Sequence, residues 1–197
     1  MTAGGVRHPL GGSSDLVRRA RDLEGYDTIS HLRQAKDYER ILGLIEKTPT
    51  SIADLGCGTG VMLQMAQERW PALEHSFGVD GARNRVETAR TRVGDRGDVQ
   101  EADLRNLALL NRKFDLITMT SVLHWLYPDE PTVFEWVGHH LAGGGVFLLT
   151  THHPALDEET QVGGEDLLVR EALIRTGFEV RALAELPGII RIRTFTK

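Results

Sequence analysis

Three glycines stand at alternate positions in one short segment that directly follows an apolar run. The segment reads Asp54-Leu55-Gly56-Cys57-Gly58-Thr59-Gly60. Because glycine has no Cβ, the backbone here can turn sharply and approach a ligand closely. The spacing G-x-G-x-G differs from the G-x-G-x-x-G of dinucleotide-binding dehydrogenases. An acid two residues before the first glycine would repel a pyrophosphate, but it would attract a ligand that carries an ammonium or sulfonium group.

Two further acids follow predicted strands. Asp80 ends the run Gly78-Val79-Asp80, and Asp103 lies in Glu101-Ala102-Asp103-Leu104. An acid at the tip of the second strand can accept hydrogen bonds from both hydroxyls of a ribose. Asp103 could accept a bond from an adenine amino group, and the Leu104 amide could donate one to the ring. Taken singly, Asp54 could instead cap the glycine loop and Asp103 the next helix, so only the ordered set favours ligand binding.

The elements around these residues alternate between strand and helix patterns. Strands are predicted at Ser51–Leu55, His75–Asp80, Val99–Ala102, Phe114–Thr120 and Val146–Thr151. Helices are predicted from Ser14 to about Glu24, from about His31 to Lys47, and at Val61–Trp70, Ala82–Val93, Pro131–Leu141 and Glu165–Thr176. This alternation predicts βαβ units and a parallel sheet with helices on both faces. Phe178–Ala184 and Ile189–Phe195, joined by a turn with Pro187-Gly188, predict an antiparallel pair.

These motifs together resemble the class I S-adenosylmethionine-dependent methyltransferase family, of the small-molecule type. The resemblance rests on Asp54–Gly60, Asp80, Asp103, Phe114-Asp115-Leu116-Ile117 and Leu141-Ala142-Gly143-Gly144-Gly145, in this order. Gly143 replaces a proline that is common in the last of these motifs, which the resemblance places in a turn before the fifth strand.

The resemblance implies an α/β fold with a doubly wound, mostly parallel, seven-stranded Rossmann-like sheet. The implied strand order is 3-2-1-4-5-7-6, with the seventh strand antiparallel. The methyltransferase domain would cover residues 51–197, and residues 1–50 would form a flexible N-terminus and a helical cap.

S-adenosylmethionine is the cofactor that the resemblance implies. The residues expected to bind it are Tyr26, Asp54, Gly56, Gly58, Gly60, Asp80, Gly81, Arg85, Asp103, Leu104 and Ser121. Tyr26 looks like the lid tyrosine of several relatives, although plain lid packing is the alternative. Arg85 stands where many relatives carry an apolar residue against adenine. It could stack on the purine, but we favour a solvated helix face shared with Arg83, Arg90, Arg92 and Arg96.

Three histidines near the expected methyl position are candidate general bases. His124 follows the fourth predicted strand, and His152 and His153 follow the fifth. An imidazole titrates near working pH, although a loop histidine is more often a surface or packing residue. A base is needed only if the acceptor must lose a proton. The adjacent histidine pairs lack the spacing of a zinc helix, so no metal is expected.

The acceptor is expected to be a small molecule, methylated at oxygen, nitrogen or carbon. The segment Thr120-Ser121-Val122-Leu123 lacks the Asn/Asp-Pro-Pro-Tyr/Phe tetrad of enzymes that methylate amino groups of DNA bases or glutamine. A methyltransferase acting on RNA or protein, and a non-catalytic cofactor-binding subunit, stay open. A nicotinamide oxidoreductase would need a different glycine spacing. Cys57 is interpreted as a small packing residue rather than a nucleophile.

Amino-acid composition and net charge indicate the cellular compartment and the partners of the protein. The chain has 197 residues, a net charge of −5 and a single cysteine. The acidic balance argues against nucleic acid as a partner. The lone cysteine cannot form an internal disulfide, and no apolar run approaches the ~20 residues that span a bilayer. We therefore expect a cytoplasmic protein with no membrane partner, and a homodimer could complete the acceptor pocket.

Overall fold

Strands and helices alternate along the computed structural model of the chain, which describes residues 35, 37–120, 122–123, 126, 130–152, 179–186 and 190–196. The strands are β1 (Ser51–Leu55), β2 (His75–Asp80), β3 (Gly97–Glu101), β4 (Phe114–Thr120), β5 (Leu141–His152), β6 (Glu179–Leu186) and β7 (Ile190–Thr196). The helices are α3 (Val61–Arg69), α4 (Arg83–Val93) and α5 (Glu130–His140), with 3-10 turns η1 (Gly94–Arg96) and η2 (Leu104–Asn106).

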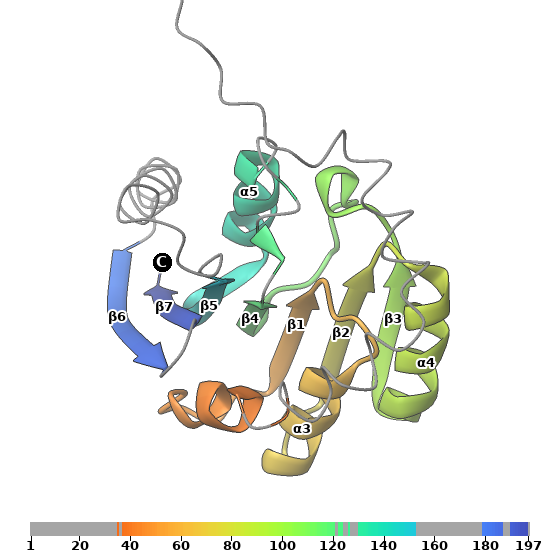
Figure 1. Ribbon diagram of the computed structural model, residues 1–197, viewed down its shortest axis with the longest axis horizontal. Coiled ribbons are helices and arrows are strands. Elements are labelled where there is room, and N and C mark those ends of the chain that lie inside the picture. Colours follow the sequence, from red (N-terminus) through yellow and green to blue (C-terminus); the bar gives the residue numbers. More distant parts are fainter. Residues whose placement is uncertain are drawn as a thin grey trace, which may run out of the picture.

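One sheet unites the strands, in the order β3-β2-β1-β4-β5-β7-β6 (Figure 1). The strands from β1 to β5 pair in parallel, whereas β7 pairs antiparallel with both β5 and β6. The chain leaves β1 toward β2 and β3, and returns to the other side of β1 with β4. Open α/β sheets bind ligands where the strand order reverses in this way. The mostly parallel, Rossmann-like class expected from the sequence is confirmed.

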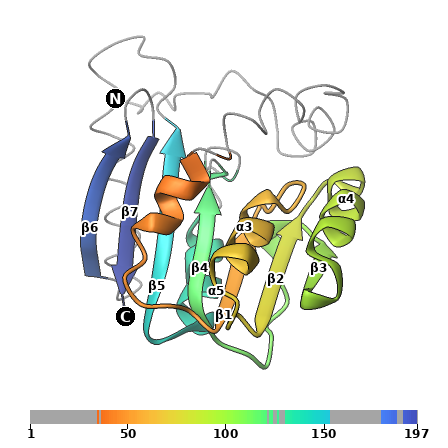
Figure 2. The ribbon, with the colours of Figure 1, turned by 90° about the horizontal axis from the view of Figure 1, so that it is seen from below.

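Side chains alternate between two faces of the sheet, and each face has its own core. Ile52 of β1 packs with residues of α3 and α4 and with Ile41 and Leu42. Ala53 and Leu55 pack on the opposite face with residues of α5. In Figure 2, α3 and the helical residues 37–43 lie in front of the strands, with α5 behind them. Strands covered on both faces are mostly apolar, and the short, mostly apolar segments of β1 and β4 allowed both to be located from the sequence.

The helix predicted from His31 to Lys47 ends earlier than expected. Within the described residues it runs only to residue 43. The amides of Leu44 and Ile45 donate to carbonyls three residues back, at 3.1 and 3.2 Å, so the helix closes in tighter turns around Gly43. Glycine is a poor helix former, and this outweighs the apolar spacing that suggested a longer helix. The helices predicted at 14–24 and 165–176 lie outside the described residues.

The prediction of a turn at Leu141–Gly145 before the fifth strand is wrong, because β5 already covers these residues. β5 begins at Leu141, which pairs with Phe114, and the next pair is Leu116 with Val146. The register shift between these pairs absorbs the extra residues, and Gly144 adopts a φ of 74°. Glycine favours such irregular positions within a strand because it tolerates positive φ. The glycine segment is therefore a bulged start of β5.

Candidate cofactor and active site

The glycine loop between β1 and α3 is attached to the end of β2. The amides of Gly56 and Cys57 both donate to the carbonyl of Val79, at 2.8 and 2.9 Å. Gly56, Gly58 and Gly60 have φ angles of 77°, 53° and 80°, a region that favours glycine. A Cβ on Gly58 would meet no protein atom within 4 Å. The loop therefore leaves an open space at its middle glycine, as a close-fitting ligand requires.

Asp80 lies beside this open space, at the carboxyl end of β2. Its Oδ2 accepts a hydrogen bond from the amide of Gly58 at 2.9 Å, and its Oδ1 accepts one from the amide of Ala82 at 2.9 Å. These bonds fix both the glycine loop and the start of α4 to one carboxylate. A carboxylate can accept about four hydrogen bonds, so a diol at this sheet edge could share Asp80 with the loop.

Asp54 is buried at the end of β1, with only 1% of its surface exposed. Its Oδ1 accepts a hydrogen bond from the hydroxyl of Thr118 at 2.7 Å, across the β1–β4 pair. Burial raises the pKa of Asp54 from 3.8 to about 7; the Thr118 bond opposes this rise, and the charge of Asp80 adds to it. A cation placed near Asp54 would favour its ionised form.

Asp103 caps the short turn η2, so the capping role left open by the sequence is present. Its Oδ1 accepts from the backbone amide of Arg105 at 3.0 Å. The guanidinium of Arg105 also binds it through two nitrogens, at 2.8 and 2.6 Å. This pairing with Arg105 holds the pKa of the Asp103 carboxyl below its ordinary value, although partial burial acts in the opposite direction. Leu104 beside it is buried in the core on the α5 side.

The chain is similar in sequence to known methyltransferases. Residues 52–145 match a family described as a methyltransferase domain. The trans-aconitate 2-methyltransferase of Pseudomonas aeruginosa is 31% identical over 146 residues, which cover 71% of this chain and 51% of the relative. The malonyl-[acyl-carrier protein] O-methyltransferase of Acetivibrio thermocellus is 28% identical over 140 residues, covering 67% of this chain and 47% of the relative. These matches support a class I S-adenosylmethionine-dependent methyltransferase, the family that the sequence motifs resemble.

A solved S-adenosylmethionine-dependent methyltransferase of Mesorhizobium loti has the same fold. It superposes with a TM-score of 0.68 at 20% identity, over 82% of this chain and 97% of that one. The present chain spans about half the length of the curated relatives that it matches. No helix among its described residues is long and apolar enough to cross a membrane.

The cofactor of this family fits the residues at the sheet edge. An open face at Gly58, a carboxylate at Asp80 and a buried acid at Asp54 suit a ligand that carries a ribose and positive charge. Gly81, the next residue after Asp80, is half-buried, as is Arg85 on the first turn of α4.

The thiol of Cys57 is buried. Burial is the largest cause that raises its pKa, and the nearby charges of Asp54 and Asp80 raise it further. This environment suits packing and disfavours a nucleophile.

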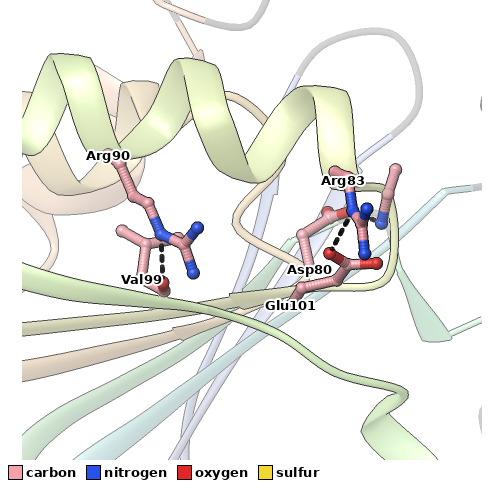
Figure 3. A network of polar contacts seen from close by, with 6 residues as sticks. Asp80, Arg83, Arg90, Val99 and Glu101 are labelled. Atoms are coloured by element: carbon pink, nitrogen blue, oxygen red, sulfur yellow. Dashed lines mark hydrogen bonds and ion pairs between the residues drawn. The ribbon is translucent and has the colours of Figure 1, made fainter.

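The arginines of α4 form more than a solvated face. Figure 3 shows Arg83 and Arg90 pointing from α4 toward β3. The Nε of Arg83 pairs with Glu101 at 2.9 Å, and the Nε of Arg90 donates to the carbonyl of Val99 at 2.9 Å. Arg92 donates to Thr59 in the glycine loop. Charge composition alone did not indicate these contacts, because their acceptors are largely backbone carbonyls.

The remaining candidate residues, Tyr26 and Ser121 for the cofactor and the three histidines for catalysis, are only partly placed. Tyr26, Ser121, His124 and His153 lie outside the described residues. His152 is the last residue of β5, and its backbone pairs with Ile190. The proposal of a histidine base therefore stays a prediction.

His140, for which no role was predicted, is a buried packing residue in the structure. Its Nδ1 donates to the carbonyl of Trp136 at 2.7 Å, and its Nε2 accepts from the amide of Leu110 at 2.9 Å. The ring also stacks on Trp136 at 3.9 Å.

Thr118 is a site residue that the sequence did not single out. It is fully buried, and its hydroxyl binds Asp54 from the neighbouring strand. A hydroxyl residue in the middle of the apolar strand Phe114–Thr120 was the available signal, since buried polar groups need a partner. Its partner could not be named, because 64 residues separate the two in sequence.

Proposed function

We propose that this chain is an S-adenosylmethionine-dependent methyltransferase that acts on a small molecule. The observation that carries the proposal is the juxtaposition of the open glycine loop with Asp54 and Asp80 at the strand-order reversal between β1 and β4. The match of residues 52–145 to a methyltransferase domain and the similarity to curated methyltransferases support it. Residues 51–197 form the catalytic domain in this proposal, with residues 1–50 as a cap.

Each cofactor contact has a role that follows from its chemistry. Asp80 accepts bonds from the ribose hydroxyls while it holds the loop, and Asp103 with Leu104 binds the adenine edge. Asp54 stabilises the positive charge of the cofactor from within the core. Tyr26, Gly81, Arg85 and Ser121 complete the proposed contacts. The bound cofactor supplies an electrophilic methyl group, and the protein orients the acceptor toward it and excludes water.

We propose a carboxylate as the acceptor group. The relatives named above act on trans-aconitate and on a malonyl group, both of which carry carboxylates. A carboxylate is already ionised at neutral pH, so its methylation needs no general base. For a hydroxyl or amine acceptor, His124, His152 and His153 are the candidate bases. The pH dependence of turnover separates these cases, because a required base gives a falling rate as the histidine is protonated.

The cellular setting is also part of the proposal. The chain would work in the cytoplasm, since its single cysteine is a buried free thiol that needs no oxidising compartment. Its net charge of −5 disfavours nucleic acid as a partner. A homodimer would complete the acceptor pocket, and light scattering at two protein concentrations tests that arrangement.

Calorimetric titration with S-adenosylmethionine tests the function directly, with NADH and NADPH as controls. Micromolar binding of the sulfonium cofactor alone supports the proposal, and tight nicotinamide binding overturns it. Methyl transfer is then measured with a panel of small di- and tricarboxylic acids, beside total RNA and a protein extract. Transfer only to the polymers would replace the small-molecule acceptor. Cofactor binding with no transfer to any acceptor would favour a non-catalytic subunit.

A further inference from the structure

Thr59, between the second and third glycines of the loop, is held by an arginine from α4. The Nη1 of Arg92 donates to the Thr59 carbonyl at 2.8 Å and to its hydroxyl at 2.9 Å. Thr59 is buried, with 7% of its surface exposed, and Arg92 is half-buried. Hydrogen bonds from a guanidinium are stronger than those between neutral groups. A buried backbone carbonyl in an irregular loop is thereby satisfied by a charged side chain 33 residues away.

A second contact from α4 falls on the next residue of the loop. A Cβ on Gly60 would lie 3.1 Å from the Cα and the Cβ of Ala89, so the two backbones are packed closely there. Ala89 and Arg92 are three residues apart and therefore lie on the same face of the helix. One face of α4 thus contacts two consecutive loop residues, while Val79 and Asp80 of β2 hold the preceding ones.

We propose that Arg92 is a positioning residue that fixes the glycine loop in its cofactor-binding conformation. The inference rests on the function proposed above. A segment with three glycines has many accessible conformations, and ordering it on binding would weaken the affinity. If only a fraction of molecules holds the loop correctly, the apparent dissociation constant rises by the inverse of that fraction. Arg92 keeps that fraction high without itself contacting the cofactor.

Arg90 offers a matched control on the same helix. Its guanidinium also donates to a backbone carbonyl, but that carbonyl belongs to Val99 in β3 (Figure 3). Arg90→Gln and Arg92→Gln each remove one positive charge and one tie between α4 and its surroundings. Only Arg92→Gln removes hydrogen bonds to the glycine loop, whereas Arg90→Gln removes a hydrogen bond to β3.

The test measures S-adenosylmethionine affinity by calorimetry and deuterium uptake of the loop peptide by mass spectrometry. Both are recorded well below the unfolding temperature of each variant. We expect Arg92→Gln to weaken binding about tenfold and to speed exchange at residues 56–64, with both changes absent in Arg90→Gln. Arg92→Lys should restore part of the affinity. Equal losses in the two Gln variants, or wild-type affinity in Arg92→Gln, would overturn the proposal.

A second variant covers the case in which Arg92→Gln fails to fold. Thr59→Val removes only the hydroxyl acceptor, so it should weaken binding by a smaller factor. Its effect should not add in full to that of Arg92→Lys in the double variant, because the hydroxyl bond that it removes is one of the two bonds that Arg92 makes to Thr59. Full additivity would contradict the inference. If the wild type binds no S-adenosylmethionine but Arg92→Gln alone loosens the loop, the proposed function fails and the role of Arg92 in ordering the loop stands.

Discussion

Replacing Asp54 by asparagine should stabilise the protein in a way that depends on pH. Asp54 is almost fully buried, and burial raises its pKa from 3.8 to about 7. As pH rises from about 4 to 7, the unfolded chain therefore loses the Asp54 proton while the folded chain retains it. A group with a raised folded pKa stabilises the fold at low pH, and this contribution disappears as pH rises through the folded value.

The pKa difference sets the magnitude of this effect. A rise from 3.8 to about 7 corresponds to about 4 kcal/mol of folding free energy, on the order of what a single buried charge contributes. Asparagine keeps an oxygen that can accept from Thr118, but it adds a buried amide donor that costs about 1–3 kcal/mol if unsatisfied. That cost does not depend on pH. It therefore cancels when the stability difference between variant and wild type is compared at pH 4 and at pH 8.

Urea unfolding of wild type and Asp54→Asn between pH 4 and pH 8 measures this quantity. The free energy of unfolding of the variant relative to wild type should rise by about 4 kcal/mol across the range. In thermal unfolding, the same change amounts to about 10 °C for a chain of this size. Asp95→Asn, at an exposed position, is the control and should show no such trend. A difference that stays constant with pH would refute the assignment of Asp54 as a buried acid with a raised pKa.

Three further outcomes are expected. Asp80→Ala should weaken S-adenosylmethionine binding about thirtyfold by calorimetry, because charge-assisted bonds to the ribose and to the loop are lost; unchanged affinity would exclude Asp80 from the site. Gly60→Ala should lower the urea midpoint more than Gly58→Ala, since its Cβ would press on the Ala89 backbone, whereas Gly58→Ala should mainly reduce cofactor affinity. Unchanged cofactor affinity in Gly58→Ala would show that the open space at Gly58 is not a ligand site. Cys57 should stay unlabelled by a thiol reagent until the protein unfolds, because its thiol is buried, and rapid labelling of the native protein would contradict this.

Local sequence was enough to locate most of the elements around the site. β1, β2 and β4 have the bounds that the sequence predicted, because strands covered on both faces are mostly apolar and stand out from the turns that flank them. The ends of less uniform segments were harder to place. β5 begins at Leu141 through a register shift against β4, and the helix expected to reach Lys47 ends at Gly43. Both limits depend on pairing and packing that no short window of sequence contains.

The chain's own sequence determined the family, the parallel fold and the set of acids expected at one sheet edge. Glycine spacing and acid position are local properties, because they follow from backbone freedom and from charge within a few residues. Tertiary structure alone decided how those residues are held. Thr118 reaches Asp54 across 64 residues, and Arg92 reaches Thr59 across 33. Such contacts arise only once the strands are side by side and α4 lies against the loop. The raised pKa of Asp54 has the same origin, since desolvation is a property of the packed core and not of the residue type.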